Sequence, residues 1–356
     1  LMDAKVQSII LDLRNNPGGL LTSAIQVSNK FLSKGTVIVQ TKGRDPESAD
    51  IEKATSTPRA PNVRLVVLVN RGSASASEIV AGAIQDHDRG VIIGETTFGK
   101  GSVQTVFEDM PQNTGLKLTT ALYYTPSGRS IHKDRKLDDI IAANFDEDGN
   151  SDGDDPATNP DSLKTHPKAF TDNKRVVYGG GGINPDITVK EKPVGNIVGQ
   201  LFAQSVFFDF AAKYAEKHQE LDRSFEVNEA LLNEFKLYVD TGKNFNYSIP
   251  GKTHLDRFRE SIKREKYDGE IVKMVDSLEK AVAAKRDDDF WANRDTIKRI
   301  LKREIASARF GSAERTIASK EWDIQLQKAI EVLNDPALYS SILTTGGAGV
   351  KSGSKQ

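Results

Sequence analysis

The stretch Asn70-Arg-Gly-Ser-Ala-Ser-Ala-Ser-Glu-Ile79 gives the clearest indication of the fold. It follows an apolar run at residues 65–69 and leads into a segment rich in Ala, Ile and Gly at residues 77–85. A short apolar run is typical of a buried strand, and the following segment has helical spacing, so the stretch predicts a strand-to-helix turn. Three serines lie on or near this turn, namely Ser73, Ser75 and Ser77.

Further strands and helices are expected on both sides of this turn. Apolar runs predict strands at residues 6–14, 36–40, 91–93 and 116–124, and helical spacing predicts a helix within residues 20–32. Alternating strands and helices predict an α/β domain with a mainly parallel sheet, in which chemistry lies at the carboxyl ends of the strands. Residues 14–19, 72–77 and 94–100 all occupy that position.

The rest of the chain changes character twice. An acidic, Gly- and Pro-containing segment at about residues 133–176 predicts a surface insertion, after which a last short strand returns to the α/β core, expected to span residues 1–190. Helical spacing over residues 195–340 predicts a separate α-helical domain. Residues 341–356 are expected to form a disordered tail.

Composition limits the classes of function. A chain of 356 residues favours two domains, and its net charge of −1 gives no global basic field for nucleic acid. The absence of Cys excludes disulfides, thiolate catalysis and Cys-ligated zinc. No apolar run approaches the ~20 residues of a membrane span. Because Leu1 opens almost directly into a strand, we expect further sequence upstream, which could carry a targeting signal.

A serine at a strand-to-helix turn is a candidate nucleophile, and Ser75 is the preferred one of the three. Ala76 would then open the next helix, where its N–H, aided by the helix dipole, could stabilise an oxyanion. The turn Asn15-Asn-Pro-Gly-Gly19 offers Gly19 as a second donor. The alternative is that these serines only cap the helix.

Lys100, in Phe98-Gly-Lys-Gly-Ser-Val-Gln104, is the candidate general base. A lysine acts as a base only when neutral, which requires burial or positive neighbours. Gln104 lies four residues on and could orient the amine without charging it. The alternative is a solvated surface lysine.

A phosphate-binding loop is a competing interpretation of Gly94-Glu-Thr-Thr-Phe-Gly-Lys100. The eighth position of that motif should be a Ser or Thr that binds Mg²⁺, but here it is Gly101, and the following residues look extended rather than helical. We therefore disfavour nucleotide binding and expect no cofactor.

Two other candidate sites are weaker. The five histidines (His87, His132, His166, His218 and His254) lack a strand-end position in the core and are expected at the surface. Residues 148–154 match the opening of a calcium loop, but its twelfth position is Asn159 instead of Glu, so a solvated acidic loop is favoured over a metal site.

Five blocks together resemble the C-terminal processing (tail-specific) proteases of peptidase family S41. In chain order, the blocks are Asp12–Gly19, Gly72–Glu78, Gly94–Gln104, Tyr124–Ser130 and Gly182–Ile187. The resemblance covers about residues 1–190. It implies a ClpP/crotonase-like core, Ser75 as nucleophile, Lys100 as base, Gln104 as its orienting partner, and Gly19 and Ala76 as oxyanion donors.

The resemblance also implies partners and a location. Such proteases cleave proteins near unstructured C-terminal tails and are usually periplasmic or otherwise extracytoplasmic. Family members normally carry an upstream PDZ domain, which no part of residues 1–356 matches. The helical C-terminal domain is expected to support self-association or to form a substrate platform. The second hypothesis is a catalytically silent S41-like binding module, against which the presence of both Ser75 and Lys100 argues.

Overall fold

The computed structural model describes residues 6–44, 49–111, 114–133, 166–242, 245–249, 251–267 and 269–344. These residues form two compact units. The first contains the described residues up to Glu191 and those from Ile324 onward, and the second lies within Lys192–Asp323. The chain therefore leaves the first unit after Glu191 and returns to it at Ile324.

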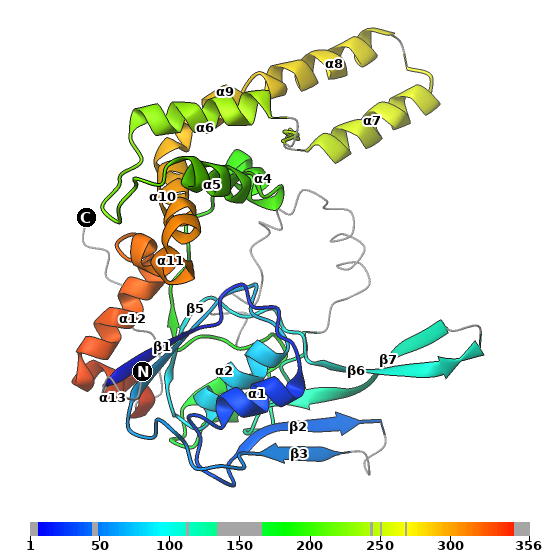
Figure 1. Cartoon of the computed structure of the whole chain (residues 1–356). Coiled ribbons are helices and arrows are strands. Elements are labelled where there is room, and N and C mark those ends of the chain that lie inside the picture. The colour runs from blue at the N-terminus through cyan, green and yellow to red at the C-terminus, as the bar shows by residue number, and fades with distance from the viewer. Residues whose placement is uncertain are drawn as a thin grey trace. The chain divides into compact units, whose positions relative to one another are not determined.

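A parallel sheet forms the centre of the first unit (Figure 1). Its strands, in spatial order, are β1 (Ser8–Asp12), β4 (Arg64–Val69), β5 (Val91–Gly94) and β10 (Ile187–Thr188). Each neighbouring pair is parallel. The carboxyl ends of β1, β4 and β5 therefore meet at one edge of the sheet, as the sequence predicted.

Alternate residues of β4 pack into two different apolar clusters. The cluster on one face includes α1 (Leu21–Ser28) and α2 (Ala76–Asp86), and the cluster on the other includes α12 (Ile324–Asn334) and α13 (Pro336–Thr344). Leu65, Val67 and Val69 belong to the first cluster, and Val66 and Leu68 to the second. Burial on both faces explains why this strand is continuously apolar.

The predicted boundary of the helical domain is wrong at its end. The sequence placed residues 195–340 in one domain, but α12 and α13 lie in the first unit, against β4 and β5. These strands need an apolar layer on each face, and the last helices of the chain supply the second. Because α13 runs to Thr344, the predicted tail from residue 341 overlaps a helix, and residues 345–356 lie outside the described residues.

A second, antiparallel sheet corrects the prediction of one mainly parallel sheet. Its strands, in spatial order, are β3 (Asp50–Lys53), β2 (Val37–Gly43), β7 (Thr114–Tyr124) and β6 (Ser102–Met110). The runs at residues 36–40 and 116–124 are strands as predicted but belong to this sheet. Run composition identifies strands but does not reveal which sheet they join.

The far end of the predicted insertion belongs to the core. β8 (Lys168–Phe170) pairs with β9 (Val176–Tyr178), and Arg175 between them is buried. The Arg175 guanidinium lies 2.6 Å from both Asp88 and Asp186, whose side chains are also buried. A buried ion pair of this kind anchors the segment. The calcium-loop candidate at residues 148–154 lies outside the described residues.

The second unit is helical, as predicted. Its helices are α4 (Asn196–Ala203), α5 (Val206–Lys217), α6 (Glu229–Thr241), α7 (Lys252–Arg264), α8 (Gly269–Ala283), α9 (Arg286–Ala292), α10 (Arg294–Phe310) and α11 (Ser312–Ser319). Aromatic rings form its core: the Phe235 ring lies 5.2 Å from that of Phe207 and 5.0 Å from that of Phe210. The α/β core followed by a helical region is therefore confirmed.

Candidate active site

Ser75 occupies a strained turn between β4 and α2. Its φ of 55° and ψ of −116° are rare for a residue with a side chain, and such strain is concentrated at functional sites. The residue directly precedes Ala76, the first residue of α2, and is partly exposed at the surface. A serine on a sharp strand-to-helix turn resembles the nucleophile elbow of other hydrolases.

The structure distinguishes Ser75 from its two neighbours. The buried Ser73 hydroxyl donates to the carbonyl of Leu13 at 2.7 Å, and the buried Ser77 hydroxyl donates to the carbonyl of Asn16 at 3.0 Å. Both serines therefore join the turn to the loop that follows β1. These two bonds are not the helix caps of the alternative interpretation, but they give Ser73 and Ser77 a structural role.

The glycine turn after β1 lies directly against the Ser75 turn. A methyl group placed on Gly18, whose φ is 95°, would lie 2.6 Å from the Ala74 carbonyl oxygen and 2.7 Å from the Ala76 nitrogen. The Ala74 N–H also donates to the Asn16 carbonyl at 3.0 Å. Only glycine permits this approach, so the loop and the turn form one structure.

The two predicted oxyanion donors are both available. The Gly18 N–H donates to the Asn16 side chain, but neither the Gly19 N–H nor the Ala76 N–H donates to any acceptor among the described residues. Gly19 also has open space around its α-carbon. An oxyanion hole requires two N–H groups near the nucleophile that have no other acceptor.

Glu78, which the sequence reasoning did not single out, connects the serine turn to the lysine loop. Its fully buried carboxylate accepts four hydrogen bonds. One oxygen accepts from the Thr97 hydroxyl at 2.5 Å and the Gly99 N–H at 2.7 Å. The other accepts from the Ser75 N–H at 2.8 Å and the Lys100 N–H at 2.9 Å. Because the last two donors share one oxygen, the backbone nitrogens of Ser75 and Lys100 lie within two hydrogen-bond lengths of each other.

Burial raises the pKa of the Glu78 carboxyl above its ordinary value of 4.5, and the four donors act in the opposite sense and limit the rise. A signal for this residue exists in the sequence. Ser75 and Glu78 have the spacing of a capping box, and Glu78 is an acid in the first turn of a largely apolar helix.

Lys100 and Gln104 are positioned less completely than predicted. The Lys100 side chain is exposed, whereas a sheltered lysine was expected. Gln104 is exposed on β6 beside a register irregularity between Val103 and Gln104, and within the described residues no hydrogen bond joins its amide to Lys100. The structure therefore brings the backbone of Lys100 to the site but does not show the predicted contact with Gln104.

Arg14, two residues after β1, connects the loop that carries Gly19 to α12. Its guanidinium donates to the carboxylate of Asp12 at 2.7 Å and to the side-chain oxygen of Gln325 at 3.3 Å. The buried Gln325 amide, on α12, also donates to the Val189 carbonyl at 2.8 Å. A residue from the last part of the chain therefore contacts the base of the loop that carries Gly19.

The histidines contribute little to this site. His87, at the end of α2, bridges the Asp172 carboxylate and the Val37 carbonyl. The backbone of His132 lies beside Gly101, where an added methyl group would approach it to 2.6 Å. Sequence position alone did not reveal that proximity.

Residues 1–142 match the family model described as peptidase family S41. The chain carries an S41 peptidase domain. Residues 197–333 match a second model, described as the C-terminal helical domain of a probable PDZ-protease. The S41 domain thus includes Ser75, Lys100 and Glu78, and the second match covers the helical unit and most of α12.

Several relatives that match this part of the chain are named as C-terminal processing proteases. A carboxy-terminal-processing protease of Bartonella bacilliformis is 53% identical over 140 residues, which are 38% of this chain and 31% of the relative. A carboxyl-terminal-processing protease of Synechocystis sp. is 47% identical over 127 residues, 35% of this chain and 28% of the relative. The solved structure of a photosystem II D1 C-terminal processing protease aligns with a TM-score of 0.38 and 30% identity, covering 55% of this chain and 38% of that one. The matched segment is thus under a third of each curated relative's length.

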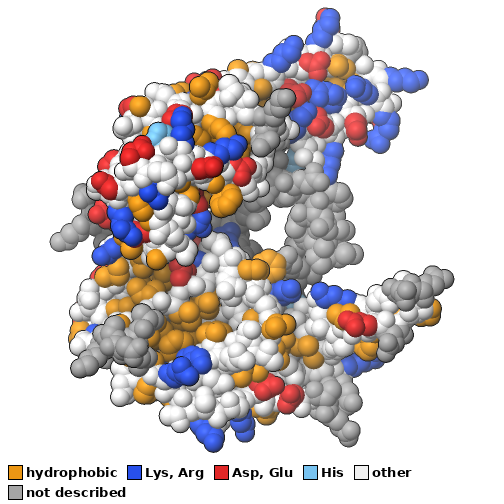
Figure 2. Space-filling view, viewed as in Figure 1, with side chains coloured by type: hydrophobic (Ala, Val, Ile, Leu, Met, Phe, Trp, Pro, Cys, Tyr) orange, Lys and Arg blue, Asp and Glu red, His pale blue; other side chains and the backbone are white. Residues whose placement is uncertain are grey.

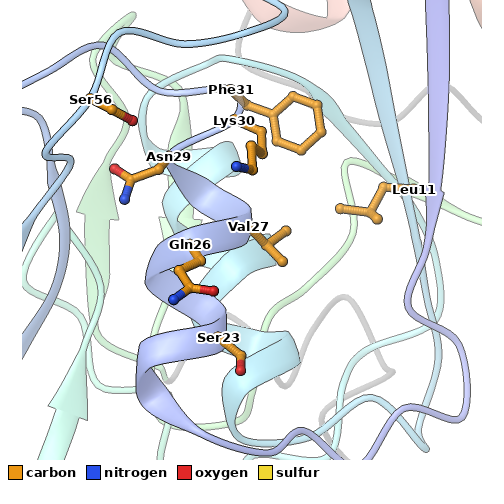
Figure 3. Close-up of a pocket in the computed structure, with 8 residues that line it drawn as sticks. All are labelled: Leu11, Ser23, Gln26, Val27, Asn29, Lys30, Phe31 and Ser56. Carbon is orange, nitrogen blue, oxygen red and sulfur yellow. The ribbon is translucent and has the colours of Figure 1, made fainter. Parts of the chain in front are cut away.

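A pocket of about 430 Å³ lies beside α1, away from the predicted site residues (Figure 3). Leu11, Val27 and Phe31 point into it.

The described residues contain no group of three or more acidic or His side chains arranged to hold a metal ion. Over the same residues, no helix combines the length and the apolar composition needed to cross a bilayer.

Proposed function

We propose that this chain is a serine endopeptidase in which Ser75 attacks a peptide carbonyl and Lys100 is the general base. The observation that carries the proposal is the joining of three loops at Ser75. Gly18 lies against the strained serine turn, and the Glu78 carboxylate ties that turn to the backbone of Lys100. The S41 match and the names of the relatives support the same reaction class.

The reaction would proceed through an acyl-enzyme. The Ser75 hydroxyl gives its proton to the Lys100 amine as its oxygen bonds to the carbonyl carbon, and the N–H groups of Gly19 and Ala76 stabilise the oxyanion. Lys100 then returns the proton to the leaving amine, and water releases the acyl group by the same steps in reverse. Gln104 would orient the amine once substrate is bound.

The substrate would be an unstructured protein tail, cut near its C-terminus, in the periplasm or another extracytoplasmic compartment. We further propose that the helical unit mediates self-association. Both ideas rest on the S41 resemblance and on the matched helical-domain model.

The test is cleavage of a protein with a disordered C-terminal tail, followed by mass spectrometry. Ser75→Ala and Lys100→Ala should each abolish cleavage. The matched controls are Ser33→Ala and Lys34→Ala, at two exposed positions outside the candidate site, and they should leave cleavage unchanged. If Ser75→Ala or Lys100→Ala cleaves as fast as the unaltered chain, that assignment is wrong.

The exposure of Lys100 favours a second candidate function, a binding module without catalysis. This alternative predicts that the unaltered chain binds tails but never cuts them. A fluorophosphonate, which labels activated serines, separates the two functions. If Lys100 activates Ser75, the probe should label Ser75 in the unaltered chain but not in Lys100→Ala. A binding module without catalysis should be labelled in neither chain.

A further inference from the structure

The strand β6 combines an open edge with a start beside the candidate active site. β6 is the last strand of its sheet, so among the described residues its outer edge pairs with no other strand. It begins two positions after Lys100 and carries Gln104. Through the shared Glu78 oxygen, the start of β6 lies close to Ser75.

The β6–β7 hairpin also exposes apolar side chains. Phe107 is opposite Leu116 in the register and Thr105 is opposite Leu118, so these four lie on one face of the hairpin. Phe107, Leu116 and Leu118 are 45%, 41% and 46% exposed. Hydrophobic side chains appear among charged ones along this hairpin in Figure 2. Proteins normally shield an apolar edge strand, because it invites pairing with another chain.

We propose that the open edge of β6 docks the substrate: an extended, unfolded, apolar polypeptide segment pairs with it as an added strand. The proposal rests on the proposed protease function, since the occupant is identified by continuity with Ser75 and Lys100. An extended chain supplies backbone groups to the edge and places alternate side chains on the face formed by Phe107, Leu116 and Leu118. A folded domain or a helix cannot pair in this way.

The irregularity at Val103 and Gln104 fits such a track. A bulge bends a strand and redirects its side chains, and bulges recur beside active sites. It would turn the added strand from the hairpin toward Ser75. At ~3.4 Å per residue, the strand from Ser102 to Met110 is about 30 Å long, so it accommodates about nine residues of substrate.

The test measures binding without cleavage. Ser75→Ala of the full chain is titrated into a fluorescein-labelled unfolded peptide of about twelve residues with alternating Leu and Ser, followed by anisotropy. In that background, Phe107→Ser and Leu118→Ser should each weaken binding about tenfold. Ile51→Ser is the matched control, because Ile51 is 51% exposed on β3, the opposite edge of the same sheet. It should bind as tightly as the parent.

A second probe leaves the protein unchanged. Peptides N-methylated at one set of alternate residues should lose binding, because their N–H groups face β6, and those methylated at the other set should retain it. Unchanged affinity for both sets overturns strand addition, even if a hairpin variant fails to fold. A change of oligomeric state by light scattering in Phe107→Ser, with peptide affinity unchanged, would make the edge an interface between copies and also overturn the proposal. Binding with the predicted pattern but no cleavage by the unaltered chain would instead remove only the proposed chemistry.

Discussion

Replacing Glu78 by Gln tests whether one buried carboxylate holds the candidate site together. The amide keeps the shape of the side chain but offers one accepting oxygen, so two of its four donors would face an NH₂ group. Each buried donor left without an acceptor costs about 1–3 kcal/mol, so we expect Glu78→Gln to lower the free energy of unfolding by about 2–6 kcal/mol.

Glu78→Gln should also reduce the activity of the molecules that remain folded, beyond the activity lost through unfolding. Ser75 and Lys100 donate to the same oxygen, so losing it alters their separation, and a 1 Å misplacement can lower a rate about 100-fold. We expect kcat to fall at least ~100-fold in the fraction that remains folded by urea titration. The matched control is Glu331→Gln, an exposed acid on α12, which should change neither quantity. A folded Glu78→Gln chain that retains kcat within twofold would show that Glu78 does not hold Ser75 and Lys100 in their working positions.

The pH dependence supplies an independent check, because stability and activity should change with pH in opposite directions. Because burial raises the pKa of Glu78 above 4.5, the folded state holds that proton more tightly than the unfolded chain. Its contribution to stability is therefore greatest below pH 4.5 and decreases as the pH rises through the raised pKa. Activity should change the other way, because only the carboxylate accepts all four donors. Both trends should vanish in Glu78→Gln, and parallel trends of stability and activity would contradict the assignment.

Three further substitutions test the surrounding structure. Gly18→Ala should lower kcat at least ~100-fold, because its methyl group would lie 2.6 Å from a backbone oxygen of the serine turn, whereas Gly35→Ala, at a similar φ but in open space, should cost only about 1 kcal/mol of stability. The buried Arg129 guanidinium lies 2.8 Å from the buried Asp86 carboxylate, so Asp86→Asn leaves it without its charge partner and should lower the free energy of unfolding by about 3–5 kcal/mol in urea titrations. Gln325→Leu removes the bond to Arg14 and should lower kcat with little change in KM, while Gln325→Glu should restore it; equal kcat in both variants and the parent would exclude a positioning role.

The elements of the fold were predictable where local pattern determines them. The apolar run in β4, the helix after Ser75 and the helical second unit all follow from periodicity. The assignment of strands to two sheets did not follow, because an apolar run looks the same in either. Nor did the placement of α12, since amphipathic spacing shows that a helix has a buried face but not what that face covers.

The candidate site was predictable only as a set of residues. Motif composition identified Ser75, Gly19 and Lys100, but the connection between Ser75 and Lys100 depends on Glu78, whose role arises when the serine turn and the loop of residues 97–100 meet one carboxylate. A buried acid with four backbone and hydroxyl donors has no sequence signature beyond its spacing from Ser75. The same limit applies to Gln325, which reaches Arg14 from the far end of the chain.

The exposure of Lys100 is consistent with this arrangement. Glu78 fixes the backbone of the lysine and leaves its side chain in solvent, so the described residues supply position but not shelter. Removing water from an amine disfavours its charged form and favours the neutral form, and a general base must be neutral. A polypeptide paired along β6 would pass beside Lys100 and exclude water from it. Substrate docking would then increase the activation of Ser75 above its level in the chain without a bound tail.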